Sequence, residues 1–147
     1  MPMKEKTIDQ MLRETWLSVA KYYNDEAAKF DGTMTIGFTL LNIDPKEGTP
    51  STVLPAKMGL EVTGLTRTLN KMLDRGLIYK EPHPKDKRSV IVKLTPLGLE
   101  MRNKAKEVVL ALNEKIAYYA GEDRIKCMRE MMEIILDLTQ RKNQKST

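Results

Sequence analysis

Apolar residues recur every three or four positions along most of the chain, which is the spacing of one face of an α-helix. The pattern predicts a long helix over residues 5–30. A shorter helix is expected over residues 34–43, with a strand as the competing interpretation because several of its residues are β-branched. Two further long helices are expected over residues 96–120 and 122–141.

The most informative stretch is residues 49–94, where the pattern predicts a helix, a tight turn, a second helix and two short strands. Thr49-Pro50 has the composition of a helix start, a hydroxyl cap followed by a proline in the first turn. Pro55 lies about one turn later and has no backbone donor, so this helix either bends there or begins later. The second helix is expected over residues 62–75, and Gly76 ends it in a left-handed conformation.

Strands are expected over residues 77–81 and 89–94, joined by a loop whose two prolines and four charged residues project it into solvent. The predicted fold is therefore mainly α with a small two-stranded β-hairpin. It has a winged helix-turn-helix core, and the N- and C-terminal helices form a dimerisation region. We expect one intertwined domain, with an N-terminal dimerisation helix (1–32), a DNA-binding lobe (33–95) and C-terminal dimerisation helices (96–147).

The last predicted helix is unusual because its apolar arc is too wide for one neighbour. One stripe holds Ile125, Met128, Met132 and Ile135, and beside it lie Cys127, Met131, Ile134 and Leu138. This width predicts a second covered surface, so the first helix and the last two are expected to form a dimer interface. Cys127 is expected to be a small buried hydrophobe, and residues 141–147 a disordered tail.

Composition narrows the function class. The 147 residues include 31% charged and 41% hydrophobic residues, which is ordinary for a globular protein. No apolar run is long enough to cross a bilayer, the N-terminus lacks the features of a signal peptide, and one cysteine cannot form an intrachain disulfide. We therefore expect a cytoplasmic protein without a membrane partner. The net charge of +5 mildly favours a polyanionic partner.

The helix over residues 62–75 has one apolar face and one face of polar and basic residues. Helix-turn-helix geometry places the N-terminal half of such a helix against base edges in the DNA major groove. Arg67 can contact guanine through two hydrogen bonds, whereas Asn70 and Lys71 are expected on phosphates. The predicted recognition-helix contacts are Thr63, Gly64, Thr66, Arg67, Asn70 and Lys71.

The loop between the predicted strands is the candidate wing, with contacts predicted at Lys85, Asp86, Lys87 and Arg88. Arg88 is expected to enter the minor groove, with the lysines on flanking phosphates. Asp86 is unfavourable near phosphate unless it pairs with Arg88 or with Arg75. His83, between two prolines, is expected to shape the wing. A merely solvated basic loop is the structural alternative.

These segments resemble the MarR (multiple antibiotic resistance regulator) family. The resemblance rests on the Gly59-Leu60 turn, the helix Thr63–Lys71, the Arg75–Ile78 exit, the Asp86-Lys87-Arg88 wing and the Leu-Thr-x-x-Gly start at Leu94–Gly98. The specific match is confined to about residues 59–98, while the layout of helices covers nearly the whole chain. The chain departs from the family pattern at Pro55, at Glu61, which weakens the helix cap, and at Gly64.

The resemblance implies a homodimer that uses two winged helices to bind a palindromic operator in double-stranded DNA. It also implies that the protein acts as a ligand-responsive repressor. It also implies a small aromatic or phenolic effector bound between the DNA-binding lobes and the dimer helices. The candidate pocket residues are Trp16, Tyr22, Tyr23 and Phe38. Aromatic residues at helical spacing more often belong to the core, which is the alternative interpretation.

Enzyme and metal motifs fail on inspection, so no catalytic residue, cofactor or metal site is predicted. With one histidine and one cysteine, the chain cannot build a zinc site of the common ligand types or a hydrolytic triad in convincing context. Two alternatives to DNA binding stay open. One is a winged-helix scaffold for protein–protein contacts. The other is a helical dimer that binds a small molecule without affinity for DNA.

Overall fold

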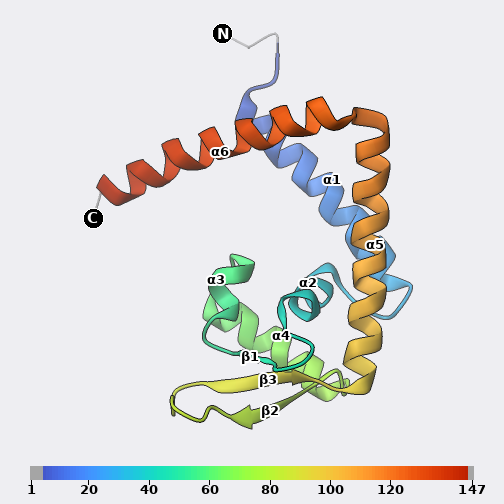
Figure 1. Ribbon diagram of the computed structural model, residues 1–147, viewed down its shortest axis with the longest axis vertical. Coiled ribbons are helices and arrows are strands. Elements are labelled where there is room, and N and C mark those ends of the chain that lie inside the picture. The colour runs from blue at the N-terminus through green and yellow to red at the C-terminus, as the bar shows by residue number, and fades with distance from the viewer. Residues whose placement is uncertain (1–4, 146–147) are drawn as a thin grey trace. The chain divides into compact units, whose positions relative to one another are not determined.

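The computed structural model describes residues 5–145, which form six helices and three strands (Figure 1). In chain order these are α1 (Ile8–Ala28), α2 (Met34–Asn42), β1 (Thr49–Pro50), α3 (Leu54–Met58), α4 (Val62–Asp74), β2 (Ile78–Pro82), β3 (Val90–Leu94), α5 (Pro96–Ala120) and α6 (Glu122–Lys145). They divide into two compact units, one up to Val108 and one from Val109 on. The mainly helical fold with a small antiparallel sheet confirms the predicted fold class.

The segment with two competing interpretations is helical. The hydroxyl of Thr33 accepts a hydrogen bond from the Ile36 amide at 3.2 Å and caps α2. Ile36 and Leu40, four residues apart, are both buried, so one stripe of the helix enters the core. Tertiary burial therefore outweighs the weak helix preference of the β-branched residues.

The sheet has three strands rather than the predicted two, because Thr49-Pro50 is a strand and not a helix start. In the order β1-β3-β2, Thr49 lies opposite Val92 and Pro50 opposite Ile91. The Thr49 hydroxyl accepts from the Asp44 amide at 2.9 Å, so it closes the preceding loop instead of capping a helix. Pro50 is tolerated because β1 is an edge strand, where a missing backbone donor costs little.

The position of β1 also resolves the problem that Pro55 posed. Helix α3 begins at Leu54, which puts Pro55 in the first turn, where no intrahelical donor is required. The helix does not bend at Pro55; it begins later than Thr49. Gly59 ends it in the left-handed conformation, with φ of 63°, and the Leu60 amide donates to the Pro55 carbonyl at 3.0 Å.

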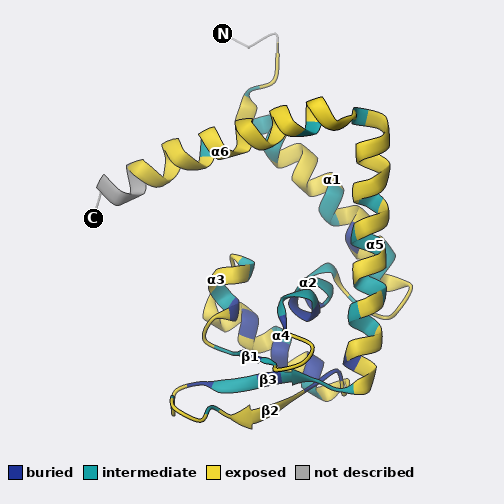
Figure 2. Ribbon diagram, in the orientation of Figure 1, coloured by how far each residue is buried: buried dark blue, intermediate teal, exposed yellow. Residues whose placement is uncertain are grey.

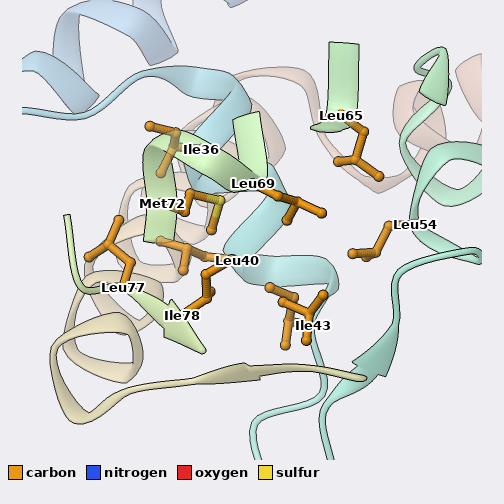
Figure 3. Close-up of a cluster of buried hydrophobic side chains, with 10 residues drawn as sticks. Ile36, Leu40, Ile43, Leu54, Leu65, Leu69, Met72, Leu77 and Ile78 are labelled. Atoms are coloured by element: carbon orange, nitrogen blue, oxygen red, sulfur yellow. The ribbon is translucent and has the colours of Figure 1, made fainter. Parts of the chain in front are cut away.

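The core of the first unit lies between α2, α3, α4 and the sheet (Figure 3). Side chains from all of these elements meet there, and most are less than 5% exposed. Its buried members are Ile36, Leu40, Ile43, Leu54, Leu65, Leu69, Met72, Leu77, Ile78 and Val92. Because α4 contributes three of these residues, its outward face is fixed relative to the sheet.

The second unit holds the end of α5 and all of α6. Helix α6 continues to Lys145, so residues 141–145 are helical and the prediction of a tail starting at 141 was wrong for them; residues 146–147 lie outside the described part of the chain. Most described side chains of α6 are exposed within the single chain (Figure 2). Cys127 is exposed, which contradicts its predicted burial. Within residues 5–145, no helix has the length and apolar character that a bilayer span requires.

Candidate nucleic-acid interface

Helix α4 presents two chemically opposite faces. Leu65, Leu69 and Met72 are buried, at spacings of four and three residues, and anchor the helix to the core. All six residues predicted for DNA contact are exposed: Thr63, Gly64, Thr66, Arg67, Asn70 and Lys71. The helix thus holds a polar, basic surface in a fixed orientation, as the sequence predicted.

The start of α4 is open to an approaching ligand. Glu61 is the N-cap residue, and its side chain makes no capping hydrogen bond, in agreement with the predicted weak cap. A Cβ atom added at Gly64 would meet no atom within 4 Å, so nothing in the chain covers this position. The Thr66 hydroxyl donates to the Val62 carbonyl at 2.9 Å, so its oxygen can still accept a hydrogen bond from a partner.

The end of α4 is joined firmly to the start of α5. Gly76, with φ of 70°, allows the Leu77 amide to donate back to the Met72 carbonyl at 2.9 Å. The Thr95 hydroxyl donates to the Gly76 carbonyl and accepts from the Gly98 amide at 3.0 Å, capping α5. Gly98 packs directly on the Leu77 carbonyl group. These contacts fix the C-terminal end of α4 against the start of α5.

The wing is held by its own side chains. Asp86 Oδ1 accepts from the Arg88 amide at 2.9 Å and lies 3.4 Å from Arg88 Nε. Of the two predicted partners of Asp86, the structure therefore shows Arg88; Arg75 instead donates to the Phe30 carbonyl at 3.5 Å. The Arg88 side chain is 91% exposed, so it remains available to a partner. Lys85 and Lys87 are also exposed.

The hairpin below the wing is braced across its strands. Lys93 on β3 forms an ion pair with Glu81 on β2 at 2.9 Å. The hydrogen bond from the Glu81 carboxylate is the main reason why the pKa of Lys93 is raised above its ordinary value. Lys93 therefore stays charged throughout the physiological range, and its ion pair with Glu81 joins the two strands.

A hydroxyl cluster that the sequence did not reveal connects the wing to the helix-turn-helix. Ser89, 4% exposed, has its Oγ 3.4 Å from that of Ser51 and 3.3 Å from Thr52 Oγ1. The Val90 amide donates to Ser51 Oγ at 3.3 Å. Because these residues are distant in the chain and resemble ordinary loop serines and threonines, only their pairing in space identifies them.

The four candidate pocket residues separate into two kinds. Tyr23, which is buried, makes edge-to-face contacts with Tyr22 (5.8 Å between ring centroids) and Phe38 (5.5 Å). Trp16 is 53% exposed and lies outside this set of ring contacts among the described residues. Tyr23 is therefore packed between the other two rings, as a core residue would be. Among the described residues, no group of three or more His, Cys, Asp or Glu side chains is arranged to hold a metal ion.

These features define a winged helix-turn-helix protein. Helix α4 has one buried face and one polar outer face, a short helix and a turn precede it, and a hairpin with a basic tip follows it. Residues 33–90 match the model of the MarR family. This match confirms the resemblance over the winged helix-turn-helix segment. It is 46% identical over 41 residues to the multiple antibiotic resistance protein MarR of Salmonella typhimurium, a match that spans 28% of each protein.

Solved structures resemble a much larger part of the chain. The Staphylococcus aureus MepR–DNA complex covers 90% of this chain and 98% of its own, with a TM-score of 0.83 and 16% identity. The transcriptional repressor CouR bound to a 23-mer DNA duplex covers 92% and 97%, with a TM-score of 0.78 and 23% identity. At these identities the likeness establishes the fold, and it extends beyond residues 33–90 to the flanking helices.

Proposed function

We propose that this protein is a cytoplasmic transcriptional regulator that binds double-stranded DNA in a sequence-specific manner. One observation carries the proposal: the exposed polar face of α4 and the exposed cations of the wing belong to one unit and are held by one core. A helix of this kind fits the major groove while the wing reaches the adjacent backbone or minor groove. Both structurally similar proteins described above were solved bound to DNA, which supports the same mode of binding here.

Exposed apolar side chains support a homodimer. In the second unit, Tyr118 and Tyr119 are 83% and 74% exposed, and Leu138 is 62% exposed. Side chains of this size rarely remain in water over several turns of helix. A second copy of the chain would cover them and supply a second winged helix, so the operator would be palindromic. Sedimentation equilibrium of the purified protein tests this step, and a monomer at micromolar concentration would refute it.

DNA binding is tested by fluorescence anisotropy with duplexes selected from a random-sequence library. Arg67→Ala should lose discrimination at one base position of each half-site, by about 1–3 kcal/mol. Arg88→Ala should weaken binding to many sequences and flatten the salt dependence, since each phosphate contact adds to that slope. Lys21→Ala is the matched control, because it removes one exposed cation of α1 that pairs with Asp25.

The outcomes separate the proposal from its alternatives. Equal losses on all sequences would make Arg67 a phosphate contact rather than a base reader. An unchanged affinity and salt slope for Arg88→Ala would remove the wing from the interface. Failure of the wild-type protein to bind duplex DNA at low salt would leave the fold as a scaffold for protein contacts or as a small-molecule-binding dimer.

A small aromatic or phenolic effector that releases the DNA is the second part of the proposal. The aromatic residues Tyr22, Tyr23 and Phe38 lie together, and Trp16 and Tyr22 are more than 40% exposed. A thermal-shift screen of phenolic acids, with and without DNA, tests this part. An effector should raise the melting temperature of the free protein and weaken DNA binding. If no compound in the screen does both, the aromatic residues belong to the core alone.

A further inference from the structure

The single histidine of the chain organises the tip of the wing. Its Nδ1 atom accepts hydrogen bonds from two backbone amides, that of Lys85 at 3.0 Å and that of Asp86 at 2.9 Å. His83 is half-buried and lies between Pro82 and Pro84, which restrict the backbone on both sides. The imidazole therefore closes the turn by satisfying two amides that have no partner in the sheet ladder.

The same arrangement occurs elsewhere in the chain with a different acceptor. Asp44 Oδ1 accepts from the amides two and three residues later, those of Lys46 at 2.8 Å and Glu47 at 2.9 Å. These two donors hold the pKa of Asp44 below its ordinary value. The loop at Asp44 thus keeps its acceptor at any pH above the acid range. The loop at His83 keeps its acceptor only while Nδ1 carries no proton.

The turn at His83 leads directly to Arg88. The imidazole fixes the backbone of Asp86, and the Asp86 carboxylate in turn holds the Arg88 amide and lies 3.4 Å from its Nε atom. The protonation state of His83 is therefore coupled, through one intervening residue, to the cation expected to contact DNA. His83 touches no base or phosphate in this scheme, so it acts as a positioning residue.

The charges around His83 reinforce the effect of protonation. Lys80 and Glu81 of β2 and Asp86 and Lys87 of the wing line the same shallow hollow as the imidazole. The uncharged Ser89 and Val90, at the start of β3, complete this side of the lining. Glu81 is already paired with Lys93. An imidazolium would be repelled by the two lysines and drawn to Asp86, where it competes with Arg88. Protonation therefore removes the acceptor of two amides and also gives Asp86 a second cation.

We propose that His83 makes the wing's hold on DNA dependent on pH: the neutral imidazole keeps Arg88 in its binding arrangement, and the protonated imidazole releases it. This inference rests on the proposed DNA-binding function. Imidazole is the side chain that ordinarily changes charge between pH 5 and 8. The chain has one histidine, so replacing His83 removes its entire imidazole content.

The experiment measures binding of the full-length protein to one library-selected duplex at pH 7.0 and pH 5.5, at constant ionic strength. Wild-type affinity should fall about tenfold on acidification, as two hydrogen bonds of ordinary strength are lost. His83→Asn keeps an acceptor oxygen that does not titrate, so its affinity should change little with pH. His83→Ala should bind weakly at both pH values, and Asn should recover binding relative to Ala. Arg88→Ala should also lose the pH dependence, because His83 acts through Arg88.

A measurement on the free protein keeps the inference separate from the DNA-binding function. In ¹⁵N NMR spectra, the Lys85 and Asp86 amide signals should move together with the imidazole titration in the wild type and stay in place in His83→Asn. Any of three results would overturn the inference. The Lys85 and Asp86 amide signals could stay in place while the imidazole titrates, the wild-type affinity could be constant or rise on acidification, or His83→Asn could show the same pH dependence as the wild type. Absence of DNA binding at pH 7.0 would instead refute the proposed function, and the regulatory claim with it.

Discussion

Replacing Gly98 by alanine tests whether the joint between α4 and α5 is as tight as the structure shows. A Cβ atom at Gly98 would lie 2.9 Å from the Leu77 carbonyl carbon and closer still to its oxygen. Both are backbone atoms, so no side chain can turn aside to make room. The first turn of α5 would have to move away from Leu77, weakening the Thr95 hydrogen bonds to Gly76 and Gly98.

The size of the effect follows from two opposing terms. Overpacking a close contact costs about 1–3 kcal/mol, and more where backbone must shift. Alanine in a helix is favoured over glycine by up to about 1 kcal/mol. We therefore expect Gly98→Ala to lower the free energy of unfolding by about 2 kcal/mol. With a urea m-value of about 2 kcal/mol/M, the midpoint should fall by roughly 1 M.

Urea unfolding followed by circular dichroism, at one fixed protein concentration, measures this shift. Gly64→Ala is the matched control, because it makes the same change in a helix where nothing beyond the adjacent helix backbone lies within 4 Å of the new methyl group. It should gain up to about 1 kcal/mol of stability from helix propensity alone. A Gly98→Ala midpoint equal to or above that of the wild type would refute the close contact with Leu77.

Three further predictions use the same assay. Thr95→Val removes the α5 cap and the bond to Gly76 and should cost about 1–2 kcal/mol. Thr68→Val, at a half-buried threonine that bonds only to its own helix, should change little. Met72→Ala should cost about 2–5 kcal/mol because Met72 is fully buried, and a loss below 1 kcal/mol would place it outside the core. The pKa of Asp44 is lowered, so its contribution to the free energy of unfolding is present above its ordinary pKa and is lost as the pH falls through the lowered value. Asp44→Asn should lack this acid-induced loss. Equal acid sensitivity of the wild type and the variant would contradict the role of Asp44.

Much of the candidate interface was predictable because it depends on short-range sequence patterns. The buried stripe of α4 follows from apolar residues at helical spacing, and Gly76 marks its end because a left-handed residue is needed there. The pairing of Asp86 with Arg88 was one of two predicted options, since an acid in a loop expected to approach phosphate requires a cation. The roles of these residues in DNA contact remain predictions.

The sequence by itself determined where most of the helices lie, the buried face of α4 and the basic wing, because each depends on residues within a few turns of one another. Only the tertiary structure decided that Thr49-Pro50 is a strand, since its local composition suits a helix start and its partners Val92 and Ile91 lie far along the chain. The same holds for Gly98, where the backbone of Leu77 leaves no room for a side chain. The local preference of a segment for helix or strand is weak, so hydrogen-bond partners and packing contacts from distant parts of the chain decide its conformation.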